Sequence, residues 1–347
     1  MRIVQIAAIE ESVPPHKYGG TELVVSNITE GMVARGHEVF LLASGDSKTN
    51  GRLKPLIPKS LRNTYEGDEL ELWRNYYRFS ALADILDVIR KIKPDVVHNH
   101  LTWRMVMFER FIRAPMFTTV HGPLTALFER TAYTRFSQSN FVSISDNQRK
   151  AMPNMNWVRT IYNGIDVEAF EFSDKSGDYF VFLGRISPEK GIGEICKMIR
   201  KTSHKLKIAA KVDPVDRKYF ETEVKPYIDG EQIEFLGEVD HPVKVKLLKG
   251  AKAILHFLSW EEPFSLAIIE SMACGTPVIS NPRGSMREQI VDNKTGFFVQ
   301  SIAEMQEKLD QVDKLKRIDS RNHVAENFSK ERMVEEYLSL AYDLHRT

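Results

Sequence analysis

Short runs of aliphatic and β-branched residues alternate with longer amphipathic stretches through most of this chain, and this alternation constrains the fold more than any other feature. Residues 3–7 and 39–43 are short, mostly apolar runs, residues 95–98 contain the pair Val96 and Val97, and each segment is followed by a polar or glycine-containing loop. Continuous apolar runs of this length are typical of parallel strands, because helices cover both faces of a parallel sheet. The pattern therefore predicts an α/β fold built from repeated strand–helix units.

The 347 residues suffice for two such domains, and the periodic pattern lapses at residues 162–178. We interpret this polar segment as a hinge near Asp166, and two similar halves imply a cleft between them. We therefore expect a Rossmann-like domain at 1–166, a second at 167–328, and a terminal segment at 329–347 that contains a helix over 331–344. The further predicted strands are at residues 116–120, 141–145, 179–183, 206–210, 233–236, 253–258 and 277–280.

Composition and charge exclude several classes of protein. With 48 Lys and Arg against 47 Asp and Glu, the formal charge of +1 is too balanced for a dedicated nucleic-acid binder. Two cysteines, Cys196 and Cys274, are too few for a disulfide scaffold and lack a metal or redox spacing. The chain does not open with the layout of a signal peptide, and no run of about 18 apolar residues would span a bilayer. We expect a cytoplasmic protein.

Two cations follow the strand predicted at 179–183. In the segment from Gly184 to Gly191, Arg185 and Lys190 lie five residues apart in a loop with glycine at both borders. At the carboxyl end of a parallel strand, such a loop faces the ligand crevice. An arginine and a lysine together suit a diphosphate, because one offers a planar fork and the other a mobile charge. The loop is a candidate phosphate site, and two solvated cations are the alternative.

The segment from residue 261 to residue 277 carries the strongest signal. Pro263 and Ser265 favour a helix start, while Gly275 and Pro277 indicate its end, so the sequence predicts a helix of about ten residues. The first backbone N–H groups of this helix, at residues 264–266, would be free to form an anion site.

Two glutamates belong to the same segment. Glu262 lies just before the predicted helix start, and Glu270, one turn past Leu266, can project from the same face. The alternative is that both are surface residues or caps.

Taken together, these residues resemble family 4 of the retaining glycosyltransferases. The matching motifs are Glu-Pro-Phe-Ser-Leu with a second glutamate eight positions on, Gly-Arg-x-x-x-x-Lys-Gly, Tyr-Asn-Gly-Ile-Asp at the hinge, and Gly19-Gly20 after the first strand. The resemblance implies the GT-B fold, in which two Rossmann-like domains face each other across a cleft and a C-terminal helix crosses back to the first domain.

The resemblance also implies an activity. It predicts a hexosyltransferase that moves a hexosyl group from a nucleotide diphosphate sugar to a hydroxyl acceptor, with retention of configuration and without a metal or cofactor. A UDP-sugar is favoured over a GDP-sugar. The acceptor stays open among a small molecule, a glycan and a lipid-linked glycan, and so does peripheral contact with a membrane.

Roles for individual residues follow from the same resemblance. Glu262 would lie beside the hydroxyls of the donor sugar, Glu270 would hold the ribose, and Arg185 and Lys190 would grip the diphosphate. His121 would lie near the reacting carbon and the O6 of the sugar. The sequence departs from the family in Ser265, where glycine is commoner, and in His-Gly-Pro, where His-Asp is frequent. The implied catalytic residues are Arg185, Lys190, Glu262 and His121, and the implied donor-binding residues are Gly19, Gly20, Gly184, Phe264, Ser265, Leu266 and Glu270.

Three histidines suggest another kind of site. His98, His100 and His121 could form a metal site, but a core or cleft-lining role is favoured. No Asp-x-Asp motif occurs, so the divalent cation that carboxylates hold in the other large glycosyltransferase fold has no obvious ligands. Residues 104–113 mix cations with bulky apolar side chains, as an interfacial helix or a buried one does. Residues 52–62 are interpreted as an exposed loop near the acceptor side.

Other functions stay open at this point. A GT-B epimerase or phosphorylase would keep the fold, and a sugar-nucleotide-binding protein without catalysis would keep the donor site. A nicotinamide dehydrogenase is disfavoured, because Tyr18-Gly19-Gly20-Thr21-Glu22 is not the Gly-x-Gly-x-x-Gly fingerprint.

Overall fold

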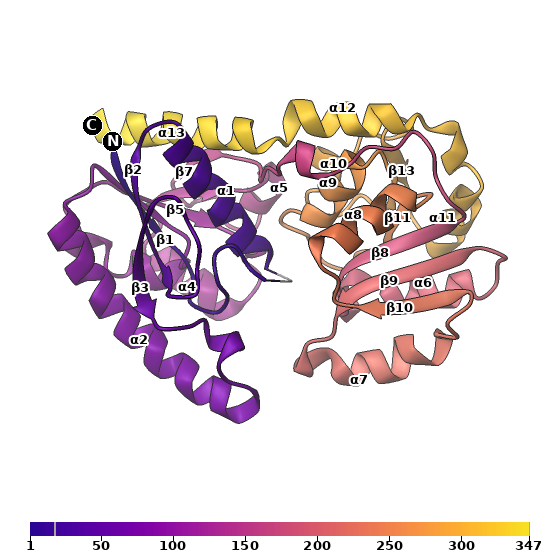
Figure 1. Cartoon of the computed structure of the whole chain (residues 1–347), viewed down its shortest axis with the longest axis horizontal. Helices are drawn as coiled ribbons and strands as arrows, with labels where there is room; N and C mark the ends of the chain where they lie inside the picture. The colour runs from indigo at the N-terminus through magenta and orange to yellow at the C-terminus, as the bar shows by residue number, and fades with distance from the viewer. Residues whose placement is uncertain (17–18, 347) are drawn as a thin grey trace. The chain divides into compact units, whose positions relative to one another are not determined.

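A computed structural model describes residues 1–16 and 19–346 (Figure 1). It divides into two compact units, the first formed by residues 1–164 with the segment from Lys330, and the second by Ile165–Ser329. Tyr18, which we named in the first loop, lies outside the described residues. Among residues 1–16 and 19–346, none of the helices combines the length and apolar composition that crossing a bilayer requires.

The first unit is built on a parallel sheet of seven strands in the order β3-β2-β1-β4-β5-β6-β7. The inner strand β1 (Arg2–Ile6) is buried at every position after its first residue, as expected for a strand covered on both faces. The other strands are β2 (Glu38–Ser44), β3 (Arg52–Ile57), β4 (Val96–Asn99), β5 (Met116–Val120), β6 (Asn140–Ser143) and β7 (Trp157–Thr160).

Helices cover the two faces of this sheet. On one face, Val4 and Ile6 of β1 pack in a cluster with Ile85 and Ile89 of α2 (Gly67–Ile92). On the other, Val25 of α1 packs against β2. The remaining helices of the unit are α1 (Gly20–Ala34), α3 (Trp103–Val106), α4 (Leu127–Arg135), α5 (Asp146–Arg149) and α13 (Lys330–Arg346).

The last helix, α13, belongs to the first unit although the second unit precedes it in sequence. It lies along α1, where a Cβ on Gly31 would be only 2.5 Å from a methyl group of Val334. The buried Tyr337 also hydrogen-bonds through its hydroxyl to Thr119 Oγ1 of β5, at 3.0 Å. Glycine at position 31 therefore permits the close approach of the two helices.

Two expectations for this unit are wrong. Residues 52–62 are not an exposed loop: they form β3 and a short 3₁₀ turn, because Leu56, Ile57 and Leu61 are buried against α2. Residues 104–113 do not form one helix: α3 ends at Val106 and a separate turn covers Glu109–Phe111.

The second unit contains a parallel sheet of six strands in the order β10-β9-β8-β11-β12-β13. Its strands are β8 (Tyr179–Arg185), β9 (Lys205–Lys211), β10 (Ile233–Gly237), β11 (Ile254–His256), β12 (Val278–Ser280) and β13 (Gly296–Phe298). Its helices are α6 (Ile192–Ile199), α7 (Arg217–Tyr219), α8 (His241–Gly250), α9 (Leu266–Ala273), α10 (Met286–Gln289), α11 (Ile302–Leu309) and α12 (Arg317–Asn327).

Candidate functional site

The strand order of the second unit creates a switch point between β8 and β11. β9 lies on one side of β8 and β11 on the other, so the connections that leave these strands run in opposite directions. Ligands of open α/β sheets bind at this point, outside the carboxyl ends of the strands. The loops concerned follow Arg185, the last residue of β8, and His256, the last residue of β11. The predicted cationic loop is the first of these loops, and Glu262 lies in the second, while Glu270 lies in the helix α9 that follows it.

An ion pair joins the two loops. The ammonium group of Lys190 contacts the carboxylate of Glu262, and both side chains are largely buried, with 12% and 8% of their surface exposed. The indole N–H of Trp260 donates a second hydrogen bond to Glu262 Oε2, at 3.0 Å. A buried charge is tolerated only when it is paired and hydrogen-bonded, so the charge of each of these side chains stabilises the other in its buried position.

The glycine after Lys190 is required by its surroundings. Gly191 has φ +72°, a left-handed conformation, and a Cβ there would lie 2.0 Å from the carbonyl oxygen of Phe257. The loop after β8 therefore touches the backbone of the loop after β11, an approach that only glycine allows.

Arg185 is surrounded by carboxylates. Its guanidinium lies 3.1 Å from Asp216 Oδ2, 2.5 Å from Glu189 Oε1 and 3.9 Å from Asp213 Oδ2. A diphosphate would have to share this cation with them or displace them. Asp213 and Asp216 were not predicted from the sequence. The signal that could have found them is a pair of acids just after the predicted strand at 206–210.

The start of α9 differs in part from the expectation of free N–H groups. The N–H of Ser265 donates to Gln289 Oε1 at 3.1 Å, and Gln289 Nε2 donates back to the carbonyl oxygen of Ser265 at 2.9 Å. The N–H of Ser265 is therefore occupied, and it is not available to an anion. Gln289, from α10, is a residue that sequence reasoning missed.

Gly284, a further residue that sequence reasoning missed, supports the backbone of Glu262. Gly284 has φ +60°, and a Cβ there would lie 2.3 Å from the backbone nitrogen and oxygen of Glu262. The next residue, Ser285, donates its N–H to the carbonyl oxygen of Glu262 at 2.9 Å. The sequence signal was the Pro-Arg-Gly-Ser run after the predicted strand at 277–280. The loop after β12 thus fixes the position of Glu262.

The second glutamate has its own cation. Glu270 is 4% exposed, and its Oε1 accepts a hydrogen bond from Lys244 Nζ of α8 at 2.6 Å. Glu262, taken as a whole residue, is 6% exposed. Both glutamates are therefore buried and ion-paired, and the alternative that they are surface residues is wrong.

In the first unit, the three histidines lie together at the carboxyl ends of β4 and β5, with the rings of His98 and His100 in contact. His100 Nδ1 lies 2.9 Å from His121 Nε2, and His98 Nε2 lies 2.8 Å from Thr119 Oγ1. Burial lowers the pKa of His121 to about 4 and lowers the pKa of His98 and His100 well below the usual value. All three imidazoles are therefore neutral near pH 7.

The loops that follow β4 and β5 contain strained backbone. Thr102, after β4, has φ +58°, and Leu124, after His121, also has φ +58° while being almost fully buried. Left-handed conformations of residues other than glycine cost about 1–3 kcal/mol each and cluster at functional sites. Within residues 1–16 and 19–346, no group of three His, Cys, Asp or Glu side chains has a geometry that could hold a metal ion.

The glycine pair after the first strand begins α1. Gly20 is the first residue of the helix and Gly19 precedes it. A Cβ on Gly19 would lie 2.6 Å from the Cβ of Pro15. Packing within this loop thus already demands glycine at position 19.

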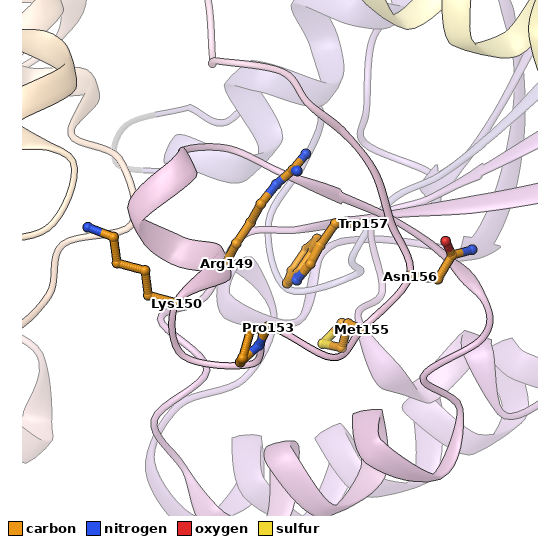
Figure 2. Close-up of a pocket in the computed structure, with 6 residues that line it drawn as sticks. All are labelled: Arg149, Lys150, Pro153, Met155, Asn156 and Trp157. Carbon is orange, nitrogen blue, oxygen red and sulfur yellow. The ribbon is translucent and has the colours of Figure 1, made fainter.

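A pocket of about 460 Å³ lies beside α5 and β7 (Figure 2). Arg149 donates from Nε to Ser143 Oγ at 2.8 Å, and its guanidinium lies 6.0 Å from the centroid of the Trp157 ring. None of the residues that the sequence analysis singled out as functional lines it. The lining residues are Arg149, Lys150, Pro153, Met155, Asn156 and Trp157.

Two family models match this chain. The model described as Glycosyltransferase Family 4 matches residues 18–169, and the one described as Glycosyl transferases group 1 matches residues 167–331. The two matches run in succession through both units.

Relatives align with most of the chain at low identity. A glycogen synthase of Mycobacterium tuberculosis is 22% identical over 84% of this chain and 81% of its own. An N-acetyl-alpha-D-glucosaminyl L-malate synthase of Bacillus anthracis is 23% identical over 94% of this chain and 95% of its own.

Solved structures share the fold. A sucrose-phosphate synthase of Thermosynechococcus elongatus superposes with a TM-score of 0.81 at 18% identity, covering 99% of both chains. HepE of Anabaena, solved in complex with UDP-glucose, superposes with a TM-score of 0.75 at 15% identity, covering 99% of this chain and all of its own.

Proposed function

Because this chain belongs to glycosyltransferase family 4 and is a glycosyltransferase of the GT-B fold, we propose that it moves a hexosyl group from a UDP-sugar to a hydroxyl acceptor with retention of configuration. The observation that carries the proposal is the ion pair between Lys190 and Glu262 at the switch point of the second sheet, with Arg185 at the end of the adjacent strand. The UDP-glucose held by the similar Anabaena protein favours a uridine donor.

The chemistry of transfer explains why cations belong at this point. As the glycosidic bond to the donor breaks, positive charge develops on the anomeric carbon and negative charge on the departing diphosphate. Fixed positive groups at the leaving oxygens stabilise that transition state, and the analogous loss of one hydrogen-bond donor from an oxyanion hole costs about 2.7–4 kcal/mol. We assign Arg185 and Lys190 to this task, in place of a metal ion or cofactor.

The carboxylates around these cations balance their charge while no diphosphate is bound. In the absence of a diphosphate, Glu262 neutralises Lys190, while Asp216 and Glu189 neutralise Arg185. A bound diphosphate shares Lys190 with Glu262, whose carboxylate is then free to accept hydrogen bonds from the sugar hydroxyls. The acceptor hydroxyl attacks from the face that the diphosphate leaves, and the departing phosphate oxygens take up its proton.

The other residues complete the donor site. We assign Glu270 to the ribose hydroxyls, because its Oε2 accepts no hydrogen bond from the described residues while Oε1 is held by Lys244. His121 is assigned to the O6 hydroxyl of the sugar. Gly19, Gly20 and Gly184, with Phe264, Ser265 and Leu266, are assigned to the walls of the donor site.

The test is the fate of UDP-glucose and UDP-galactose, each incubated with the protein and a panel of hydroxyl acceptors. We expect slow hydrolysis or transfer, with the anomeric configuration of the product retained in proton NMR spectra. Arg185→Ala and Glu270→Ala should lose most of the activity while their circular dichroism spectra stay unchanged. Full activity in both variants, or an isomerised donor or a sugar phosphate as the product, would overturn the proposal.

A further inference from the structure

A chain of hydrogen bonds runs behind His121 into the core of the first unit. His100 Nδ1 lies 2.9 Å from His121 Nε2, and on its other side His100 Nε2 lies 3.0 Å from Gln5 Oε1. Gln5 is fully buried in β1 and His100 is 2% exposed. The three side chains come from β1 and from the ends of β4 and β5, and therefore connect three neighbouring strands of one sheet.

The side-chain amide of Gln5, at the buried end of this series of hydrogen bonds, has one preferred orientation. Gln5 Nε2 lies 3.3 Å from Met32 Sδ of α1. A thioether sulfur accepts a hydrogen bond weakly and donates none, so the amide NH₂ group belongs on the sulfur side. The amide oxygen of Gln5 consequently faces His100. The opposite orientation would leave that oxygen against sulfur without a donor, a buried acceptor with no partner.

The orientation of the Gln5 amide determines which nitrogen carries the proton on each of the two histidine rings. Because Gln5 Oε1 can only accept, His100 carries its proton on Nε2, and its Nδ1 is left as an acceptor. His121 must then donate from Nε2, so its Nδ1 carries no proton. Neither ring has a carboxylate partner among the described residues, and the ring nearest to His100 is the imidazole of His98, with centroids 3.9 Å apart. Nothing in this cluster stabilises a charged imidazole.

We propose that Gln5 and His100 are positioning residues that hold His121 as the neutral tautomer protonated on Nε2, and that this tautomer selects donors with a hydroxyl at C6. The inference rests on the proposed function, since it takes His121 as the residue that meets the O6 of the sugar. An unprotonated Nδ1 accepts a hydrogen bond from a hydroxyl at C6. Its lone pair repels the C6 carboxylate of a hexuronate, so a UDP-hexuronate should be rejected.

The first experiment reads the tautomer directly and needs no activity. In long-range proton–nitrogen NMR spectra of ligand-free protein labelled with ¹⁵N only in histidine, we expect the wild-type His121 signals to report a protonated Nε2 and a bare Nδ1 near pH 7. Gln5→Leu and His100→Phe should both give a mixture of tautomers at His121. Thr119→Val is the matched control, because it removes the hydrogen-bond partner that His98 and Tyr337 share and leaves the Gln5–His100–His121 chain intact.

Two results would overturn the positioning role. One is a wild-type His121 that is charged or protonated on Nδ1. The other is an unchanged single tautomer in both Gln5→Leu and His100→Phe. If either variant fails to fold, the wild-type spectrum alone decides the matter.

The second experiment tests specificity through binding. We expect wild-type protein to bind UDP-glucuronate at least about tenfold more weakly than UDP-glucose, as the loss of a hydrogen bond and a buried lone-pair repulsion together imply. In Gln5→Leu and His100→Phe, the ratio of the dissociation constants for UDP-glucuronate and UDP-glucose should fall toward one. Equal wild-type affinities would overturn the specificity claim. Wild-type protein that binds neither UDP nor UDP-glucose would instead remove the proposed function, and the tautomer result would stand by itself.

Discussion

The ammonium group of Lys190 contacts the carboxylate of Glu262, 72 positions further along the chain, where the loops after β8 and β11 meet. If Glu262 competes with a diphosphate for this cation, Glu262→Gln should bind UDP at least as tightly as wild type. The same variant should lower kcat/KM for UDP-glucose by about 10- to 100-fold, because it loses a charged contact to the sugar. Calorimetry with UDP and initial rates of transfer provide the two measurements. Weakened UDP binding in Glu262→Gln would contradict the competition.

Lys244 should tune recognition of the ribose. It donates to Glu270 Oε1 at 2.6 Å, and without it the buried carboxylate loses its countercharge. We expect wild-type protein to prefer UDP over 2′-deoxy-UDP by about tenfold, the value of one charged hydrogen bond, and Lys244→Met to lose most of this preference. Both affinities can be measured by calorimetry.

Lys249→Met is the matched control for Lys244, since Lys249 pairs with the exposed Glu171 at 2.7 Å. It should keep the wild-type preference for UDP. An unchanged preference in Lys244→Met would show that Lys244 has no part in the recognition of ribose.

Gly191→Ala should destabilise the protein by about 2–4 kcal/mol, since it combines a left-handed residue with an overpacked contact. A Cβ there would lie 2.0 Å from Phe257 O. Gly230→Ala is the control: Gly230 has φ +79° but open space around it, so only the conformational cost of about 1–2 kcal/mol applies. The midpoint of urea unfolding compares the two. Equal midpoints would contradict the close contact between the loops.

The buried histidines should make the protein sensitive to acid. Burial lowers the pKa of His256 to about 3 from an ordinary value of 6.5. Between these values the unfolded chain binds a proton that the folded protein does not, so stability present above pH 6.5 is lost as the pH falls. The expected loss is about 1.4 kcal/mol per pH unit for each such group, and His98, His100 and His121 act in the same direction.

His256→Gln isolates the contribution of one ring. Between pH 7 and pH 5, urea unfolding of this variant should lose about 2 kcal/mol less stability than wild type, as the linkage relation requires. An identical loss in the two proteins would mean that His256 is not held neutral in the folded state.

Most of the strands could be predicted from apolar runs, because parallel strands that are buried on both faces consist mainly of apolar residues. The run at residues 116–120 coincides with β5, and the run at 3–7 overlaps β1. β3, β7 and β13 were missed, and each of them is an edge strand of its sheet. In β3, the exposed Arg52 and Lys54 interrupt the apolar pattern.

The candidate site was predictable as a set of residues and not as a set of contacts. Spacing and a family resemblance picked out Arg185, Lys190, Glu262 and Glu270. Their partners depend on how distant segments pack, so no local pattern could indicate that Lys244 reaches Glu270 or that Gln289 occupies the N–H of Ser265. The chain from Gln5 through His100 to His121 likewise exists only once β1, β4 and β5 lie side by side.

The most direct test of the central claim is calorimetric binding of UDP to wild type, Arg185→Ala and Arg200→Ala. Arg200 is the matched control, because it is also ion-paired, to Asp229, but both partners are exposed on the second unit. We predict that Arg185→Ala weakens UDP binding by at least about tenfold, as loss of a charge-assisted contact to phosphate implies, while Arg200→Ala binds as wild type does. Equal affinity of Arg185→Ala and wild type would contradict a diphosphate site at the end of β8.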